Sequence, residues 1–325
     1  MGLRSVGGWL LACGLVLQPA GAGSTTVLLL ANREAPLAGV WGSQPPPPEF
    51  RSAPVTTVTR AGETLYGLLA ATPPRDVPAA RNGAALAELC RQDRLAVVVA
   101  IGGDAAQAAA RECAVPLLVV QTPRQQVVPL LADPPRRGIS AIYLEAEPAL
   151  NLRVLRALLP AAGTVGVFVP ASAPAWLPPL RAEAQRLQLT LEELTVTDDL
   201  DTVRALRPRL ASLDAVLLPP ESALINEWSL KPLLLMTIRQ GIPVFGGLTA
   251  RYVEAGVLAA VVADADRLPA QLQAALAELA RGQVPAPAYP AASRVVVNPT
   301  VAHSLAVPAA ALERSRSVSL QAVDP

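Results

Sequence analysis

Histidine is almost absent from this sequence: His303 is the single one among 325 residues. Histidine is the most frequent general base of enzymes and a common zinc ligand, so its scarcity disfavours both kinds of chemistry. The sequence also lacks a G-x-S-x-G nucleophile elbow and any cluster with metal-ligand spacing. We therefore expect a protein that is not an enzyme and that needs neither a metal nor another cofactor. His303 itself, in TVAHSLAVP, is interpreted as a helix-surface or helix-packing residue.

Neither sign of charge is in excess: the formal net charge is +1, and no basic or acidic tail is present. Nucleic-acid binding needs a basic patch to neutralise phosphates, so no nucleic-acid partner is predicted. Three aspartates crowd together in TDDLDTV, at Asp198, Asp199 and Asp201. They lack the spacing and the glycine of a calcium loop, and they are interpreted as caps of a helix that starts near Thr202.

No apolar run is long enough to span a bilayer, which takes ~20 residues. The run near the start, Trp9 to Leu17, is shorter than this. Arg4 precedes this run, and Ala20-Gly21-Ala22 follows it as an A-x-A cleavage pattern. Residues 1–22 are therefore predicted to be a secretory signal peptide cleaved after Ala22, in preference to a membrane anchor. The mature protein is expected in the periplasm.

Cysteine is scarce, and removal of the signal peptide leaves only Cys90 and Cys113. An oxidising compartment lets a disulfide persist, and the two residues flank the predicted strand Leu95 to Ile101 near one edge of a sheet. A Cys90–Cys113 bridge and two buried free thiols remain alternatives.

What the sequence does have is a regular alternation of short apolar runs and segments of helical spacing. Strands that alternate with helices of this length predict parallel sheets covered on both faces, hence an α/β fold. The expected strands are Thr26–Ala31, Leu95–Ile101, Pro116–Val120, Ile139–Leu144, Val165–Val169, Ala215–Leu218, Pro243–Phe245, Leu258–Val262 and Arg294–Val297. The expected helices are Ala84–Arg91, Ala105–Cys113, Asn151–Leu159, Leu177–Leu187, Thr202–Leu213, Leu230–Gln240 and Pro269–Arg281.

Ligands of such sheets bind beyond the carboxyl ends of the strands. In VVVAIGGDAAQAAA, Gly102 and Gly103 follow a strand and let a ligand approach the backbone, and Asp104 is expected to cap the next helix. The free amides of that helix start suit an anion such as a carboxylate, although Asp104 would compete for them. The alternative is a tight turn without a ligand. A dinucleotide site is not predicted, because G-x-G-x-x-G and a P-loop lysine are missing.

Small and hydroxyl-bearing residues follow three later strands in the same way. They offer hydrogen-bond donors without filling space, and ordinary helix caps are the alternative interpretation. They are Ser172, Ser222, Gly247 and Thr249, and the acidic Glu221 directly precedes Ser222.

Aromatic residues make up only 3% of the chain, yet Trp41, Trp176 and Trp228 each come shortly after a predicted strand. This position would put the three tryptophans toward one rim of the fold, at the strand ends. A tryptophan there can form a flat wall against a ligand, and simple partial burial is the alternative.

Several segments together resemble the periplasmic substrate-binding proteins of ABC importers, in the branch that includes aromatic amino-acid binders. The segments begin with VVVAIGGDAAQAAA and VPLLVVQTP, continue with RRGISAIYLEAEPALNLRVLRALLPAAGTVGVFVPAS and LDAVLLPPESALINEWSLKPLLLMTIRQGIPVFGGLTARYVEAGVLAAVVADADRLPAQLQAALAELARGQVPA, and end with SRVVVNPTVAHSLAVPAAAL. They occur in the family's order. The resemblance implies two Rossmann-like lobes joined by a hinge, a solute held between them, and delivery to a membrane permease with its ATPase.

The ligand-binding residues that the resemblance implies lie in both lobes. The first lobe would contribute Gly102, Gly103, Asp104 and Thr122, and the second Ser172, Glu221, Ser222, Gly247 and Thr249. Residues 23–138 and 257–285 are assigned to the first lobe, and 139–256 and 286–325 to the second. The expected ligand is an amino acid or small organic acid, and a monomer is expected.

Two departures from the family pattern lie in the first lobe. Asp104 stands where the family commonly has a hydroxyl residue, and an acid there disfavours a ligand carboxylate. Pro45 to Pro48 favour an extended polyproline segment where the family has a helix. These departures motivate an alternative function, in which the fold serves as a non-transport sensor or accessory subunit of the cell envelope.

Overall fold

The computed structural model describes residues 25–31, 53–58, 64–72, 86, 90–91, 95–132 and 138–321. The predicted signal peptide, the four consecutive prolines and Trp41 lie outside the described residues. Within the described ranges, no helix is long and apolar enough to cross a membrane.

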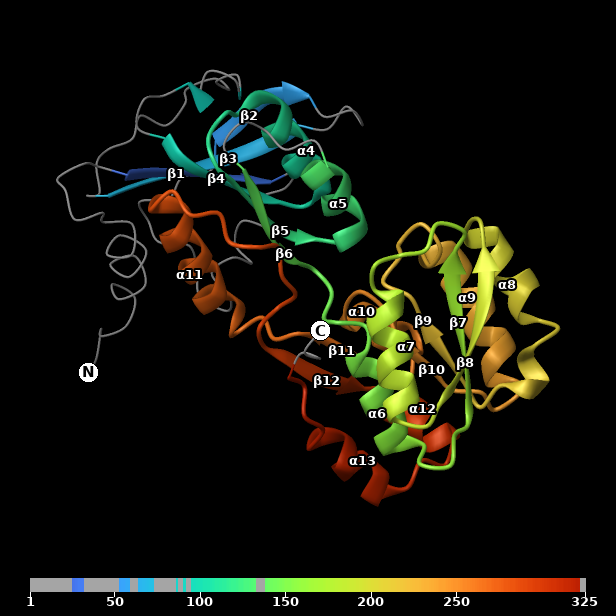
Figure 1. The fold of residues 1–325 in the computed structure, drawn as a ribbon. Helices are drawn as coiled ribbons and strands as arrows, with labels where there is room; N and C mark the ends of the chain where they lie inside the picture. Colours follow the sequence, from blue (N-terminus) through green and yellow to red (C-terminus); the bar gives the residue numbers. More distant parts are fainter. Residues whose placement is uncertain are drawn as a thin grey trace. The chain divides into compact units, whose positions relative to one another are not determined.

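The chain forms two compact α/β units, which confirms the predicted fold class (Figure 1). The first comprises Met1–Leu144 and Ala265–Tyr289, and the second Glu145–Asp264 and Pro290–Pro325. The predicted crossings at 138/139, 256/257 and 285/286 each lie a few residues earlier in the chain.

Strand pairing and one backbone contact explain these boundaries. Strand β6 (Ile139–Tyr143) pairs with β5 (Leu117–Thr122), so it belongs to the first unit. Strand β11 (Ala259–Ala263) pairs with β10 (Val244–Gly246), so it belongs to the second. The last crossing lies after Tyr289 because the amide of Ala288 still donates to the Ala141 carbonyl of β6, at 2.9 Å.

The first unit is built on a six-stranded sheet with the order β2-β3-β1-β4-β5-β6. Strands β1 (Thr25–Ala31), β4 (Leu95–Ile101), β5 and β6 are parallel, whereas β2 (Ala53–Val58) and β3 (Thr64–Thr72) add an antiparallel edge that was not predicted. The helices of this unit for which the structure gives bounds are α4 (Gly103–Glu112), α5 (Arg124–Ala132) and α11 (Leu268–Ala280).

The second unit has a sheet with the order β12-β11-β10-β9-β7-β8, in which β12 (Ser293–Val297) is antiparallel to β11 and the other pairings are parallel. The remaining strands are β7 (Thr164–Pro170), β8 (Thr190–Val196) and β9 (Ala215–Leu218). The helices are α6 (Leu150–Leu158), α7 (Leu177–Arg186), α8 (Asp199–Leu206), η1 (Leu210–Ser212), α9 (Glu227–Ile238), α10 (Ala250–Ala255), α12 (Pro299–Ser304) and α13 (Ala309–Arg316).

Helices cover both faces of this second sheet, which is why its central strands are apolar throughout. Val167 and Val169 pack with Leu155 of α6 and Leu180 of α7 on one face. Phe168, between them, packs on the other face with residues of α8 and α9. Figure 1 shows α6 and α7 on one side of the sheet and α8 and α9 on the other.

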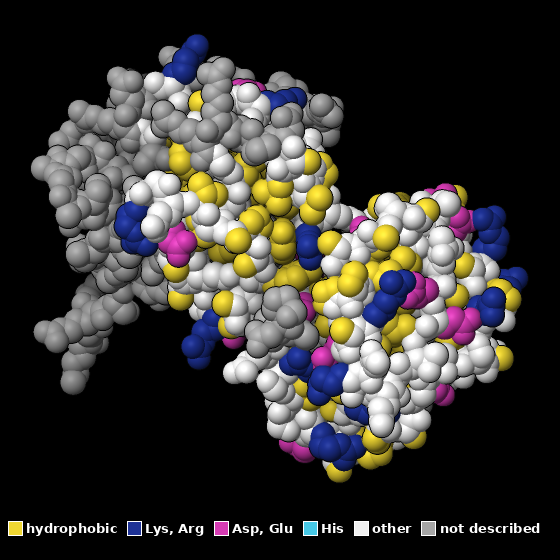
Figure 2. Space-filling view, in the orientation of Figure 1, with side chains coloured by type: hydrophobic (Ala, Val, Ile, Leu, Met, Phe, Trp, Pro, Cys, Tyr) yellow, Lys and Arg dark blue, Asp and Glu magenta, His cyan; other side chains and the backbone are white. Residues whose placement is uncertain are grey.

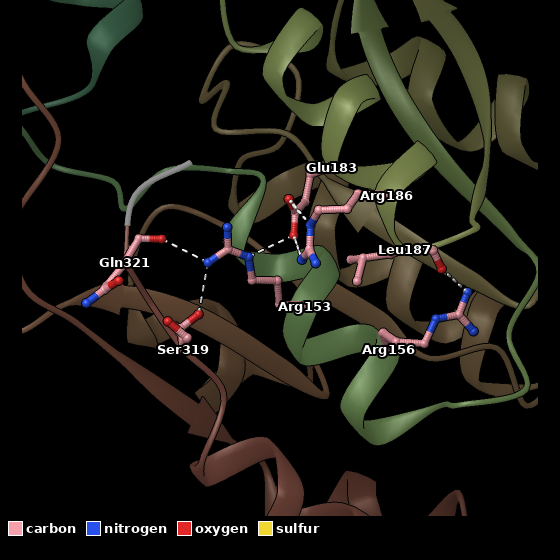
Figure 3. Close-up of polar contacts among 7 residues, drawn as sticks. All are labelled: Arg153, Arg156, Glu183, Arg186, Leu187, Ser319 and Gln321. Atoms are coloured by element: carbon pink, nitrogen blue, oxygen red, sulfur yellow. Dashed lines mark hydrogen bonds and ion pairs between the residues drawn. The ribbon is translucent and has the colours of Figure 1, made fainter. Parts of the chain in front are cut away.

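Arg153 of α6 binds a buried carboxylate and also holds the segment that follows α13. Glu183 of α7 is 1% exposed and accepts a 2.7 Å hydrogen bond from Arg153 Nε, and Arg186 also binds it. Arg153 Nη1 donates to the carbonyls of Ser319 and Gln321, at 3.0 and 2.8 Å (Figure 3). Arg153 thus links α6, α7 and the segment after α13.

Three smaller expectations are also resolved. Cys90 and Cys113 form a disulfide, with their Cα atoms 5.0 Å apart, so the bridged alternative is confirmed. Asp198 caps α8 through the amides of Leu200 and Asp201, although the helix begins at Asp199 and not near Thr202. His303 lies exposed on α12, as interpreted from the sequence.

Candidate functional site

The predicted residues of the second unit follow three neighbouring parallel strands, β7, β9 and β10, whose carboxyl ends share one edge of the sheet. Trp176 follows β7 and is 5% exposed. Its indole Nε1 donates to Glu221 Oε1, 2.8 Å away in the connection after β9. This hydrogen bond joins two of the three connections and fixes one carboxylate oxygen.

Electrostatics distinguish Glu221 from an ordinary surface acid. Burial raises the pKa of the Glu221 carboxyl above its usual range, and the hydrogen bond from Trp176 opposes this shift by favouring the ionised form. A partly desolvated carboxylate interacts strongly with a cation that arrives without its water.

The remaining predicted residues of this edge differ in their surroundings. Ser172 is exposed and Ser222 is partly exposed. Thr249 occupies the N-cap position of α10, but its side chain makes no capping hydrogen bond, so the capping alternative does not account for its hydroxyl.

Only glycine fits at position 247, because the backbone conformation is left-handed and a neighbouring side chain lies close. Its φ is +107°, and a Cβ there would lie 2.6 Å from Cγ of Tyr252. The Tyr252 ring is held in place because its hydroxyl donates to the Ile225 carbonyl at 2.9 Å. Gly247 therefore shapes the end of β10 and offers backbone only.

The tryptophans do not form a shared wall in the described part of the chain. Trp176 is buried and serves as a hydrogen-bond donor, whereas Trp228 is 85% exposed in the first turn of α9. Trp41 lies outside the described residues.

In the first unit, the turn after β4 has the predicted bare backbone. Gly102 has φ +90°, and a Cβ placed on it would meet nothing within 4 Å. The expectation that Asp104 caps the helix is wrong: α4 begins at Gly103, so Gly102 is the N-cap and Asp104 lies in the first turn. Gly102 takes the cap position because the helix already starts at Gly103.

Thr122, at the end of β5, is predicted to offer a hydroxyl, but its side chain is 0% exposed. The hydroxyl donates to the Val120 carbonyl at 3.0 Å. Gln121, just before it, has φ +50°, and the pairing of β5 with β6 shifts between Val120 and Thr122. This irregularity turns the side chain inward.

Sequence reasoning missed a cluster two residues further on. The Arg124 guanidinium lies 5.6 Å from the ring centres of both Tyr143 and Tyr289, and its Nη1 donates to the Tyr289 hydroxyl at 2.9 Å. The two rings meet edge to face with centres 5.2 Å apart. An arginine directly after the Thr122-Pro123 strand end was the one local signal.

Metal binding and large charged surfaces do not mark either unit in the described residues. Among them, no group of three or more His, Cys, Asp or Glu side chains could hold a metal ion. Figure 2 shows acidic and basic side chains interspersed over the second unit. The sites described above are therefore suited to non-covalent contacts through backbone, hydroxyl and single charged groups.

Comparison with known proteins finds similarity in structure only: no profile of a known protein family and no curated protein matches the sequence. The solved structures include the ABC domain in complex with L-Trp from Streptococcus pneumoniae, 18% identical over 70% of this chain and 81% of that chain, with a TM-score of 0.53. A ligand-free, open substrate-binding protein with adhesive properties from Clostridium difficile is 17% identical over 68% and 77%, with a TM-score of 0.53.

A third structure, a conserved domain protein from Vibrio cholerae, is 20% identical over 70% of this chain and 81% of that chain, with a TM-score of 0.52. At these identities the likeness concerns the fold. It agrees with the fold that the sequence resemblance implies, and this chain has the α/β fold of substrate-binding proteins.

Proposed function

We propose that this protein captures a small polar solute, an amino acid or small organic acid, by non-covalent contacts. The observation that carries the proposal is the Trp176–Glu221 hydrogen bond, which orients a partly buried carboxylate after β9, the middle one of three neighbouring strands; Gly247 and Thr249 follow the next strand, β10. Carboxyl ends of parallel strands are the usual ligand-binding edge of such sheets. The likeness to an L-Trp complex supports the same class of ligand.

The proposed setting is the periplasm, reached through the predicted signal peptide of residues 1–22. There the protein would act as a monomer and hand its solute to an ABC permease with its ATPase. Solute capture would need no catalytic group and no cofactor, which agrees with the scarcity of histidine.

Thermal unfolding of the mature protein tests solute capture. The protein is first unfolded and refolded to remove carried ligand, and then melted with amino acids, organic acids and sugars. A ligand at ~100 times its Kd adds about 2.7 kcal/mol to the free energy of unfolding, which shifts Tm clearly. A shift with one chemical class supports the proposal, and no shift across the panel contradicts it.

A second candidate function is an accessory or sensor subunit of the cell envelope that transports nothing. The antiparallel edge β2-β3 favours it, because this edge was not predicted and follows the proline-rich segment where the family resemblance implies a helix. Neighbouring genes separate the two candidates: an adjacent permease and ATPase favour import, and the absence of both favours the accessory role.

A further inference from the structure

The second unit has a surface pocket of about 260 Å³ at the end of its sheet opposite to the predicted solute-binding residues. Pro243 and Val244, where β10 begins, line the pocket, whereas Gly247 follows the other end of the same strand. The remaining lining residues come from α9, from the end of α10 and from α12. The pocket is therefore separate from the site around Glu221.

The walls of this pocket are mostly aliphatic. Ile242, Val244 and Val301 line it and are buried, whereas Leu235 and Ile238 of α9 are 50% and 47% exposed. Exposed aliphatic side chains gathered around a hollow are typical of a binding surface. The pocket therefore suits an apolar group that covers the two half-exposed side chains.

The pocket offers few polar partners. Thr237 is the one hydroxyl residue among those that line it, and its Oγ1 donates to the Leu233 carbonyl of its own helix, at 3.1 Å. Gly256 contributes backbone only: its φ is +125°, and a Cβ there would lie 3.3 Å from Cδ1 of Leu234. A sugar would leave its hydroxyl groups without partners against these walls, and burying such groups is unfavourable.

Lys231 gives the pocket its charge. It is the only charged residue among those that line the pocket and the only lysine of the chain. No described side chain forms an ion pair with it. Because Lys231 is exposed, its aliphatic stem can cover the apolar wall while the ammonium stays at the surface. Arg239 and Glu254, each next to a lining residue in the sequence, have opposite charges that offset each other.

We propose that this pocket binds an aliphatic carboxylate of medium chain length, with the chain against Leu235 and Ile238 and the carboxylate at Lys231. Apolar walls suit the chain, and a single ammonium at the rim suits a single negative charge. The volume of about 260 Å³ lies just below the roughly 300–1,000 Å³ of pockets for drug-sized ligands, which favours a short ligand. This second site goes beyond the proposed function and does not depend on it.

The single lysine makes the site directly observable by NMR. Reductive methylation with isotope-labelled formaldehyde keeps the lysine charge and labels Lys231 and the α-amino group of the mature protein. Hexanoate, octanoate and decanoate are then titrated below their micelle concentrations, with the alcohols of equal length as uncharged controls. We expect the Lys231 signal to shift and saturate with the carboxylates, and the Kd to fall as the chain lengthens.

Calorimetric titration of octanoate into variants tests the two parts of the pocket. Lys231→Gln should weaken Kd about three- to tenfold, because an exposed charge pair is lost, and Lys231→Arg should stay near wild type. Leu235→Ser should weaken Kd about tenfold, because the chain loses apolar contact. Leu200→Ser is the matched control, since Leu200 is 81% exposed on α8 and does not line the pocket.

Three results would overturn the assignment of this pocket to a carboxylate. They are a Lys231 signal that no carboxylate shifts, equal affinities for octanoate and octanol, and an unchanged octanoate Kd in Lys231→Gln. Glu221→Gln should leave octanoate binding intact, so binding lost in that variant would move octanoate to the solute site.

Two other occupants of the pocket are tested directly. A dimer in sedimentation velocity that Leu235→Ser dissociates would assign the pocket to a second copy of the chain. Co-sedimentation with phosphatidylglycerol vesicles that the same variant abolishes would assign it to a lipid surface. Either result contradicts the carboxylate site, and we expect neither.

Discussion

The indole of Trp176 donates a 2.8 Å hydrogen bond to Glu221, across two connections that are 45 residues apart in the sequence. Trp176 is buried beneath the sheet edge, so its large apolar ring is used for packing with α7 and β7, and its single polar atom is used to orient a carboxylate. Trp176 thus orients the carboxylate of Glu221.

Replacing Trp176 with phenylalanine should destabilise the protein by about 2 kcal/mol, because a partly buried carboxylate loses its donor. Equilibrium urea unfolding at neutral pH measures this change. Trp228→Phe is the matched control, since Trp228 is 85% exposed and its replacement should alter the free energy of unfolding by less than about 0.5 kcal/mol. Equal effects of the two substitutions would mean that the hydrogen bond is not what stabilises this edge.

Glu221 should make stability fall as pH rises. Its pKa in the fold is raised above the ordinary 4.5, so the native state binds its proton more tightly than the unfolded state does. The stability from this proton is fully present below the ordinary pKa and is lost as pH rises through the raised one. Glu221→Gln imitates the protonated form, so its stability relative to wild type should rise as pH increases from below the ordinary pKa of 4.5 through the raised one.

Urea unfolding of wild type and Glu221→Gln across this range measures the effect. Asp214→Asn provides a control carboxyl outside this edge, where Asp214 accepts the amides of Gly163 and Thr164. Stability curves of wild type and Glu221→Gln that run parallel with pH would refute the raised pKa.

Two buried strands were predictable to the residue and the other predicted strands to within one or two residues, whereas the edge strand β8 was not predicted. The runs LAVVVAI and AVLL became β4 and β9 with the predicted bounds, because strands covered on both faces read as unbroken apolar blocks. Strand β8, TLEELTV, was missed because it is an edge strand whose polar side chains face water. Its alternation of apolar and polar residues is short and resembles the end of the preceding helix.

The site was predictable only as far as backbone position. Strand ends placed Glu221, Thr249 and Gly102 at sheet edges, because topology alone decides that. Side-chain direction needed the structure: a shift in pairing turns Thr122 inward. The contact of Arg124 with Tyr289 spans 165 residues, and no local pattern announces it.

Reduction of the Cys90–Cys113 disulfide should lower the free energy of unfolding by about 2–4 kcal/mol, because the bridge closes a loop of 23 residues in the unfolded chain. Thermal unfolding with and without reductant measures the loss. The double variant Cys90→Ala, Cys113→Ala should melt near the reduced protein and ignore the reductant. A variant that still responds to reductant would place the sensitive group elsewhere.

Loss of Arg153 should lower the free energy of unfolding far more than loss of an exposed arginine that also binds a glutamate. Burial alone would raise the pKa of Glu183, but hydrogen bonds from Arg186 and Arg153 outweigh it and hold that pKa below its usual range. Arg153→Met removes one of the two and leaves a 1% exposed carboxylate poorly compensated. We expect a loss of about 3 kcal/mol and faster proteolysis after α13, where Ser319 and Gln321 lose their donor.

Arg181→Met is the matched control, because Arg181 also binds a glutamate through its Nε, at 2.6 Å from Glu193, but is 56% exposed. Solvent screens that pair, so Tm should hardly change. The double variant Arg153→Met, Glu183→Leu should recover much of the lost stability, since it removes the buried charge together with its partner. Recovery of stability without renewed protection of the segment after α13 would show that Arg153 has two separable roles, one toward Glu183 and one toward the chain end. A double variant no more stable than Arg153→Met would contradict the assignment of the loss to the unpaired carboxylate.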